Sequence, residues 1–424
     1  MSINERIEEF LNLSHSPFHV IHQMEECAAS CDNIQFGTDF VPGKNVCLKR
    51  NGSSIALIKL PEGKINAVKI SATHSDSPSF KIKPNPLLRK KDLACLNVEP
   101  YGGLIISPWF DRALSFAGRI VYEEDGQIKS SLVDIDDDLL VIPNLCIHMN
   151  RDINNGHPYN AAKETLPLFA SNLPEDFDFG KYVMEKTGCN GNLISHDLFL
   201  YVREKVKRVG KDHEFIMSPR LDDLSSAYSC FLAFLDSTPV EGQADVFVCF
   251  DNEEVGSLTK QGASSTFLAE IIDCIAEAYH LSAQEKAEVL RRSFMMSVDN
   301  AHANHPNYPE ISDATTSVKL NGGIVIKYNA NQSYTTDALS GSYVKLIAKE
   351  AGVDFQEYTN RSDLRGGSTL GNLSNNQVSL NCADVGMPQL AMHSCMETQG
   401  VKDLDAMFEF IKAFYQTTLL PLAF

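Results

Sequence analysis

The stretch Asp245-Val-Phe-Val-Cys-Phe-Asp-Asn-Glu-Glu-Val-Gly-Ser257 joins an apolar run to two adjacent carboxylates. The run from Asp245 to Phe250 predicts a buried strand, because it is short, apolar, and rich in β-branched and aromatic residues. Glu253 and Glu254 follow where this strand ends. Packing explains two acidic side chains and a glycine at that point poorly. A site in which one carboxylate binds a metal and its neighbour transfers protons explains them well.

Length and composition predict a soluble globular protein of two or three domains. The 424 residues are 43% hydrophobic and 22% charged, and no apolar run approaches the roughly 18 residues of a membrane span. The first ten residues carry charges where a signal peptide would be apolar, so we expect a cytoplasmic protein. The net charge of -18 disfavours nucleic acid and membranes as partners. The 11 cysteines, an odd number without a Cys-x-x-Cys pair, predict reduced thiols.

The order of predicted elements indicates an α/β domain interrupted by a β-rich insertion. Helices are predicted over 4–12 and about 17–30, and paired strands over 54–60 and 65–72. Short β-like runs with Pro and Gly replace this alternation from about 86 to 211. The α/β pattern then returns, with helices expected over 224–234, 338–350 and 402–416, and strands over 244–250, 294–298 and 323–327. In the helix over 338–350, one apolar face is expected to carry Leu339, Tyr343, Leu346 and Ile347. We therefore predict a central mixed sheet flanked by helices from 1–85 and 212–424, with an inserted domain over 86–211.

Residues that can bind a metal lie at the predicted ends of four strands. These residues are His74 with Asp76, Glu253 with Glu254, Asp299, and His393, while Asp222 opens the helix after residue 220. Strand ends in open α/β sheets gather where ligands bind. Imidazole and carboxylate ligands suit zinc, with cobalt or manganese as possible substitutes. The number of ligands exceeds what one four-coordinate ion needs, and it favours two ions that share a bridging carboxylate. Asp76 is placed to hold the His74 imidazole in one tautomer.

Each of these residues also has a simpler explanation when it is taken alone. Acidic residues at strand ends are usually solvated, and a lone histidine is usually structural. Asp222 beside Asp223 suits the N-terminus of a helix, where negative charge is favoured. Together the simpler explanations weaken, because each would have to place a ligand-type residue at a strand end independently.

The motifs around these residues resemble the aspartyl-aminopeptidase family of dinuclear-zinc metallo-aminopeptidases. They are Thr-His74-Ser-Asp76-Ser-Pro, Pro-Arg-Leu-Asp222, Asp-Asn-Glu253-Glu254-Val-Gly-Ser, Val-Asp299-Asn-Ala-His302 and Pro388-Gln-Leu-Ala-Met-His393. The resemblance covers nearly the whole chain from Ser16 onward. It implies a phosphorylase/hydrolase-like zinc-peptidase domain with an inserted dimerisation or lid domain. It also implies an exopeptidase that removes N-terminal residues, preferably acidic ones, from peptides.

Matched by position, the resemblance implies a role for each candidate residue. One zinc ion would be bound by His74, Asp222 and Asp299, and the other by Asp222, Glu254 and His393. The catalytic residues would be Glu253, as the general base, and Asp76 behind His74. Substrate contacts would come from His148, His302, Lys327 and Tyr334. The resemblance further implies tetrahedral dodecamers built from dimers, with His148 reaching the active site of a neighbouring subunit.

Two alternatives remain open at this point. A related two-metal carboxypeptidase or N-acyl amino acid deacylase would use the same metals without the matches at the substrate contacts. A non-catalytic scaffold on a peptidase fold would be expected to lack at least one ligand. The chain departs from the animal aspartyl enzymes at Arg361-Ser-Asp-Leu-Arg-Gly-Gly-Ser-Thr369, where Arg365 and the glycines would reshape the rim of the substrate site.

Overall fold

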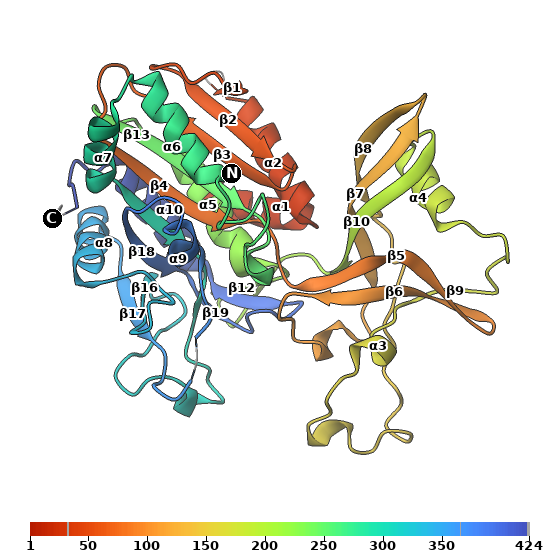
Figure 1. The fold of residues 1–424 in the computed structure, drawn as a ribbon. Coiled ribbons are helices and arrows are strands. Elements are labelled where there is room, and N and C mark those ends of the chain that lie inside the picture. Colours follow the sequence, from red (N-terminus) through yellow and green to blue (C-terminus); the bar gives the residue numbers. More distant parts are fainter. Residues whose placement is uncertain (32–33, 365, 422–424) are drawn as a thin grey trace. The chain divides into compact units, whose positions relative to one another are not determined.

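The computed structural model describes residues 1–31, 34–364 and 366–421, so Arg365 lies outside the described residues. The chain forms two compact units: one from 1–76, 206–392 and 397–424, the other from 77–205 and 393–396. The predicted mixed α/β architecture, with helices flanking a mixed sheet, is confirmed in the first unit (Figure 1). Within the described residues, no helix is long and apolar enough to cross a membrane.

A nine-stranded mixed sheet forms the centre of the first unit. Its spatial order is β1-β2-β3-β13-β4-β14-β18-β16-β17. The four central strands β13, β4, β14 and β18 are mutually parallel, so their carboxyl ends meet at one edge. The strands are β1 (Ile34–Phe36), β2 (Asn45–Arg50), β3 (Ser54–Lys59), β4 (Ala67–His74), β13 (Gln243–Phe250), β14 (Phe294–Val298), β16 (Ile324–Tyr328), β17 (Phe355–Thr359) and β18 (Asn381–Gly386).

The predicted pairing of the strands near 54–60 and 65–72 is wrong. β13 lies between β3 and β4, antiparallel to the first and parallel to the second. The link over residues 60–66 is long enough to pass the width of one intervening strand, since neighbouring strands lie about 4.8 Å apart. Two apolar runs that are close in sequence predict two strands. They do not show whether the strands pair directly as a hairpin or have a third strand between them.

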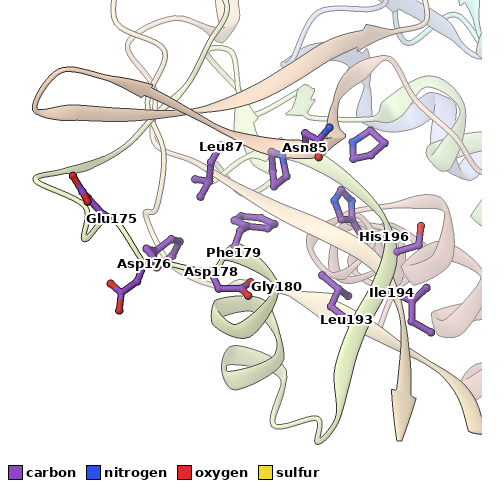
Figure 2. Close-up of a pocket in the computed structure, with 14 residues that line it drawn as sticks. Asn85, Leu87, Glu175, Asp176, Asp178, Phe179, Gly180, Leu193, Ile194 and His196 are labelled. Atoms are coloured by element: carbon purple, nitrogen blue, oxygen red, sulfur yellow. The ribbon is translucent and has the colours of Figure 1, made fainter. Parts of the chain in front are cut away.

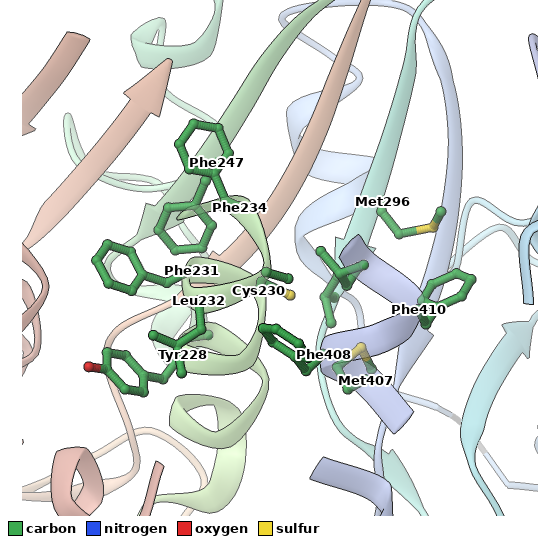
Figure 3. Close-up of a cluster of buried hydrophobic side chains, with 14 of the residues drawn as sticks. Tyr228, Cys230, Phe231, Leu232, Phe234, Phe247, Met296, Met407, Phe408 and Phe410 are labelled. Carbon is green, nitrogen blue, oxygen red and sulfur yellow. The ribbon is translucent and has the colours of Figure 1, made fainter. Parts of the chain in front are cut away.

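Helices cover both faces of this sheet because its strands present apolar side chains on both sides. Along β13, Val246 and Val248 point into one buried cluster, whereas Phe247 and Cys249 point into the other. The second cluster contains side chains of α5 and α10 (Figure 3). One face is covered by α1 (Ile3–Leu13), α2 (Pro17–Ala29), α5 (Leu221–Asp236), α8 (Ala338–Ala351) and α10 (Val401–Gln416), the other by α6 (Phe267–Ala278), α7 (Ala283–Arg292) and α9 (Leu370–Ser374).

Helix α8 differs from its predicted amphipathic pattern. Tyr343 and Ile347 are buried as expected, but Leu339 and Leu346 are 41% and 52% exposed. Their places in the core are taken by small residues of the same helix, including Ser340 and Ala348. Tight packing favours these small side chains, and a pattern based on hydrophobicity alone does not identify them.

A five-stranded sheet completes the first unit. Its order is β11-β12-β20-β19-β15. Its strands are β11 (Lys207–Val209), β12 (Phe215–Ser218), β15 (Ala301–His302), β19 (Pro388–Leu390) and β20 (Glu397–Gly400). β19, the strand that precedes His393, belongs to this smaller sheet. The prediction that it lies in the same sheet as the strands ending at the other candidate ligands is wrong.

The second unit is β-rich and is built on a six-stranded sheet of order β8-β7-β10-β5-β6-β9. Its elements are β5 (Ser79–Lys90), β6 (Leu93–Tyr101), β7 (Leu114–Glu124), β8 (Gln127–Asp134), β9 (Leu168–Ser171), β10 (Asn192–Val202), α3 (Ala161–Glu164) and α4 (Phe179–Thr187). A cavity of about 610 Å³ within this unit is lined by β5, β10, α4 and residues 175–178, and it contains none of the predicted site residues (Figure 2). All eleven cysteines lie in the described part of the chain, and no disulfide joins any two of them.

A row of buried charges crosses three adjacent strands of the large sheet. Asp245 of β13 is in register with Lys59 of β3 on one side and with Lys69 of β4 on the other. Lys59 donates hydrogen bonds to carbonyl groups at the end of α5, and Lys69 donates to Phe414 O at 2.8 Å in the last turns of α10. Each ammonium therefore adds a charged donor to carbonyl groups at the C-terminal end of a helix, where cations are favoured.

Lys69→Met should change how stability depends on pH. Burial lowers the pKa of Lys69 from 10.5 to about 8. Below pH 8 both the folded and the unfolded chain hold the proton, and the cost of burying the charge acts in full. Between pH 8 and 10.5 the unfolded chain binds more protons, so the contribution of Lys69 to the free energy of unfolding rises with pH.

We expect the stability difference between wild type and Lys69→Met to shift in favour of wild type across this window, by on the order of 1–3 kcal/mol. Thermal unfolding at a series of pH values measures this difference. The same substitution at the exposed Lys44 serves as the control and should show no such shift. A difference for Lys69→Met that stays constant with pH would contradict the prediction.

Candidate metal centre

Strand register brings the first candidate ligands to one edge of the large sheet. His74 is the last residue of β4 and lies in register with Phe250, the last residue of β13. The amide of Ser75 donates to Phe250 O at 2.8 Å, which ties the two strand ends together. Asp299 directly follows β14, the parallel neighbour of β4 on the other side. These parallel neighbours therefore deliver an imidazole and several carboxylates to the same place.

Asp222 approaches this edge from the start of α5. Its backbone, like that of Asp223, departs from helical geometry, so the first turn carries these carboxylates rather than continuing regularly. Both side chains are buried, at 3% and 0% exposure. The amide of Asp222 donates to a carboxylate oxygen of Glu397 on β20 at 3.0 Å, which fixes the backbone of this residue.

The two ring nitrogens of His74 face different partners. Nδ1 lies 3.0 Å from the backbone oxygen of Asp76 and therefore donates to it. Nε2 faces carboxylate oxygens of Asp222 at 3.5 Å and Asp299 at 3.9 Å. With a proton held on Nδ1 by a carbonyl, Nε2 is the ring nitrogen that would bind a metal after losing its own proton, as in other histidine ligands.

Two groups of side chains around His74 have ligand atoms close enough for one ion each. His74, Asp222 and Asp299 form one group, and His74, Glu253 and Glu254 form another. Within each group the candidate ligand atoms all lie within 4.8 Å of one another. The residues predicted from four separate sequence motifs are thus neighbours in space.

Asp76 positions the pair of glutamates. Its two carboxylate oxygens accept hydrogen bonds from the amides of Glu253 and Glu254, at 3.1 and 3.2 Å. The glutamates lie in a short 3-10 turn that begins after Asn252, whose φ of 62° is left-handed. We expected the Asp76 side chain to orient His74; the closer contact to the imidazole is made by the Asp76 backbone carbonyl, while the carboxylate oxygen lies 3.5 Å away.

Crowding of carboxylates in a buried region changes how these groups titrate. Burial, together with the charges of Asp299, Asp76 and Asp222, raises the pKa of Glu253 to about 8. Burial and the charge of Asp222 raise the pKa of Glu254 well above its ordinary value. Burial opposes charging of His74, yet its carboxylate neighbours outweigh that effect and raise its pKa well above 6.5.

This donor set fits a divalent cation. Oxygen and nitrogen ligands of these kinds suit zinc, and a positive ion would relieve the repulsion that raises the pKa values of the buried carboxylates. The backbone of β18 passes very close to Asp299. A Cβ on Gly386 would lie 1.9 Å from Asp299 O, so this position requires glycine.

His393 and His148 both belong to the second compact unit. His393 has a left-handed φ of 67°, and its Nδ1 donates to Gly103 O at 3.0 Å. This contact again makes Nε2 the ring nitrogen that would bind a metal. His148 is exposed in a turn between the exposed apolar residues Ile147 and Met149.

Of the other predicted substrate contacts, Lys327 lies against Asp299 and Tyr334 lies beside Lys327. Lys327 of β16 is 2% exposed, and its ammonium donates to Asp299 O at 2.7 Å and to Asp299 Oδ2 at 3.3 Å. Its Nζ lies 5.2 Å from the centre of the Tyr334 ring. Burial disfavours the charged form, but Asp299 outweighs burial and raises the pKa of Lys327. The amine is therefore a permanent cation at this edge.

His302 lies on β15 and is exposed, with its ring centre 6.0 Å from that of Tyr358. Tyr358 lies on β17 in register with Lys327, and its ring centre is 6.5 Å from that of Tyr334. Tyr358 thus joins two of the predicted contact residues. Its sequence context, Phe355-Gln-Glu-Tyr-Thr359, carries no motif that identified it.

Sequence reasoning also missed Asn300, which links the elements that carry the ligands. The Asn300 amide donates to Leu221 O at 2.7 Å, Ser225 Oγ at 3.2 Å and Gln389 Oε1 at 2.9 Å. Its own Oδ1 accepts from Ser226 at 2.7 Å. This buried network connects the residue after Asp299 to the start of α5 and to β19. Only its position next to Asp299 could have suggested it.

Comparison with known proteins agrees with this geometry. The family model described as "Aminopeptidase I zinc metalloprotease (M18)" matches residues 10–415. A "Probable M18 family aminopeptidase 2" of Clostridium novyi is 40% identical, with 88% of each chain covered. Its counterpart in Pseudomonas aeruginosa is 34% identical over 99% of each chain.

Solved structures share the fold. The chain in "Cryo-EM structure of the Ape4 and Nbr1 complex" has a TM-score of 0.93 at 31% identity, covering 98% of this chain and 85% of that one. An M18 aminopeptidase from Thermotoga maritima has a TM-score of 0.85 at 21% identity, with 97% and 95% covered. With the family model spanning nearly the whole sequence and relatives above 30% identity along its length, this chain belongs to the M18 family of zinc metalloprotease aminopeptidases.

Proposed function

We propose that this aminopeptidase uses two zinc ions to hydrolyse the first peptide bond of substrates with a free N-terminus. The observation that carries the proposal is the group of buried carboxylates around the Nε2 edge of His74. Their number and crowding exceed what one four-coordinate ion with an open position needs. The family description names a zinc aminopeptidase, so the carboxypeptidase, deacylase and scaffold alternatives lose their support.

In this proposal each zinc ion has three protein ligands, and Asp222 is shared. The first set is His74, Asp222 and Asp299, whose ligand atoms are mutually close. The second set is Asp222, Glu254 and His393. His393 is included because it comes three residues after β19 and has the same Nδ1-to-carbonyl contact as His74. Cobalt or manganese would be acceptable substitutes, since they accept the same ligands.

When bound, the zinc ions would lower the pKa of a water molecule and polarise the peptide carbonyl. Glu253 would take a proton from the attacking water and deliver it to the leaving amine. Its placement supports this role: the Glu253 amide is held by Asp76, while its carboxylate belongs to the group of ligand atoms around His74. Glu254, the next residue, would remain a ligand.

We further propose a preference for acidic N-terminal residues. Lys327 supports this preference, because its ammonium is a permanent positive charge beside Tyr334. It provides a local cation in a protein whose net charge is -18. Because this ammonium already donates to Asp299, it would attract a substrate carboxylate mainly through its electrostatic potential. His302 and Tyr334 would complete the substrate contacts.

The active enzyme is proposed to be a homo-oligomer, built from dimers into a tetrahedral dodecamer. One structurally similar chain is described as the "S. cerevesiae mApe1 dodecamer". The second unit would supply the dimer contact, and His148 would reach the site of a neighbouring subunit to stabilise developing negative charge. The exposed apolar residues Leu145, Ile147 and Met149 beside it are consistent with a segment that docks on another copy.

Removal of zinc should abolish activity and be reversible. After dialysis against a chelator, titration with zinc followed by calorimetry should give two ions per chain. Asp222→Asn should bind fewer than two, because it would weaken both sets of ligands. Glu277→Gln changes an exposed carboxylate remote from these ligands and serves as the control. Binding of a single zinc ion by the wild-type chain would contradict the two-metal proposal.

Glu253→Gln should retain both zinc ions and lose turnover. Because the substituted amide cannot accept a proton, we expect kcat to fall by roughly 100- to 10,000-fold with little change in KM. Metal analysis and steady-state kinetics on aminoacyl substrates measure the two effects separately. Turnover within about threefold of wild type would remove Glu253 from the role of general base.

Mixed oligomers should test whether His148 acts across a subunit boundary. His148→Ala and Glu253→Gln chains, each nearly inactive alone, should recover partial activity when they are unfolded together and reassembled. In such oligomers some sites combine an intact His148 from one chain with an intact Glu253 from another. Glu253→Gln mixed with Asp222→Asn is the control, because both changes lie in the same proposed site. Equal recovery in the two mixtures would contradict action in trans.

A further inference from the structure

Asp384 is a buried carboxylate beside the proposed site. It is not one of the proposed zinc ligands, catalytic residues or substrate contacts. It lies on β18, in register with Ser297 of β14 and with Lys327 of β16, and it is fully buried. Residues paired in register on neighbouring strands point to the same face of a sheet. Asp384 and Lys327 therefore present their side chains on the same side, near the edge where Asp299 lies.

Its carboxylate binds two segments that are far apart in the sequence. One oxygen accepts from the amide of Thr335 at 2.5 Å and from the Thr335 hydroxyl at 2.6 Å. The other accepts from the hydroxyl of Thr369 at 2.5 Å. The Asp384 amide also donates to the Thr336 hydroxyl at 2.8 Å. Hydrogen bonds to a charged acceptor are about twice as strong as neutral ones, so this set holds both segments firmly.

The two segments are ones on which substrate selection would depend. Thr335 directly follows Tyr334, whose ring lies beside the ammonium of Lys327. Thr369 ends the segment 361–369, which the sequence resemblance predicts to shape the rim of the substrate site. Packing around the carboxylate is tight, because a Cβ on Gly371 would lie 3.1 Å from both of its oxygens.

We propose that Asp384 is a positioning residue for substrate selection. By binding Thr335 and Thr369 together, it holds Tyr334 beside Lys327 and anchors the end of the 361–369 segment, and so it sets the shape and charge of the pocket for the substrate's N-terminal side chain. None of its hydrogen bonds described above involves a proposed zinc ligand. The inference rests on the proposed aminopeptidase function and concerns binding and selection, leaving the chemistry of the metal centre unchanged.

Asp384→Asn tests this role because it keeps the shape and removes the charge. Steady-state kinetics on substrates with N-terminal Glu, Asp, Leu and Ala give kcat, KM and preference, and metal analysis gives zinc content. We expect KM for acidic substrates to change by at least about fivefold, while kcat stays within about threefold of wild type. The ratio of kcat/KM for acidic substrates to kcat/KM for neutral substrates should change by at least about threefold. Zinc content should equal that of wild type.

A matched pair at Thr369 keeps the test independent of folding at Asp384. Thr369→Val preserves the shape but removes the hydroxyl that Asp384 binds, whereas Thr369→Ser keeps the hydroxyl. The valine variant should change KM and preference in the same direction as Asp384→Asn, and the serine variant should resemble wild type.

Three outcomes would overturn this inference without affecting the proposed function. Lower thermal stability with unchanged KM and preference in Asp384→Asn and Thr369→Val would make the role merely structural. Loss of zinc in parallel with activity would place Asp384 in the metal centre. Identical behaviour of Thr369→Val and Thr369→Ser would exclude the hydrogen bond as the cause. In each of these cases an active wild type leaves the aminopeptidase function standing. A wild-type chain that releases no N-terminal residue would overturn that function and, with it, this inference.

Discussion

Repulsion among buried carboxylates is the constraint on which the proposed site depends. Asp222, Glu253, Glu254 and Asp299 converge on one imidazole, that of His74, in a region largely removed from water. Such an arrangement raises the pKa of carboxyl groups and costs free energy unless a cation is present. The fold tolerates it because hydrogen bonds fix the backbone that carries these residues. A bound divalent cation would offset this repulsion.

The sheet and helices of the first unit fix the positions of these carboxylates and of His74. Four parallel strands bring their ends to one edge, and the helices on both faces bury the apolar side chains that keep the strands in register. Polar groups behind the ligands complete the support. Glu397 binds the amide of Asp222, Asp76 binds the amides of the glutamate pair, and Asn300 joins the segment after Asp299 to α5. Ligand orientation therefore depends on residues that do not touch metal themselves.

The residues proposed for chemistry and those proposed for selectivity lie on different strands of the large sheet. His74, the glutamate pair and Asp299 lie at or just after the ends of β4, β13 and β14, whereas Lys327 and Asp384 lie on β16 and β18. Lys327 contacts both regions, since it donates to Asp299 and lies beside Tyr334.

The sequence alone was sufficient for the elements and residue types that local patterns encode. The apolar run before Glu253 predicted a strand, because hydrophobic periodicity is a local property of the chain. The residue types around His74, Asp222 and Asp299 predicted ligands that lie together, and the resemblance of these motifs predicted the family. Only the tertiary structure decided the rest. It inserted β13 between β3 and β4, placed the strand before His393 in the smaller sheet, and revealed Asp384 as a link between two segments. Strand order and contacts between distant side chains depend on how the whole sheet packs, and no local pattern encodes that.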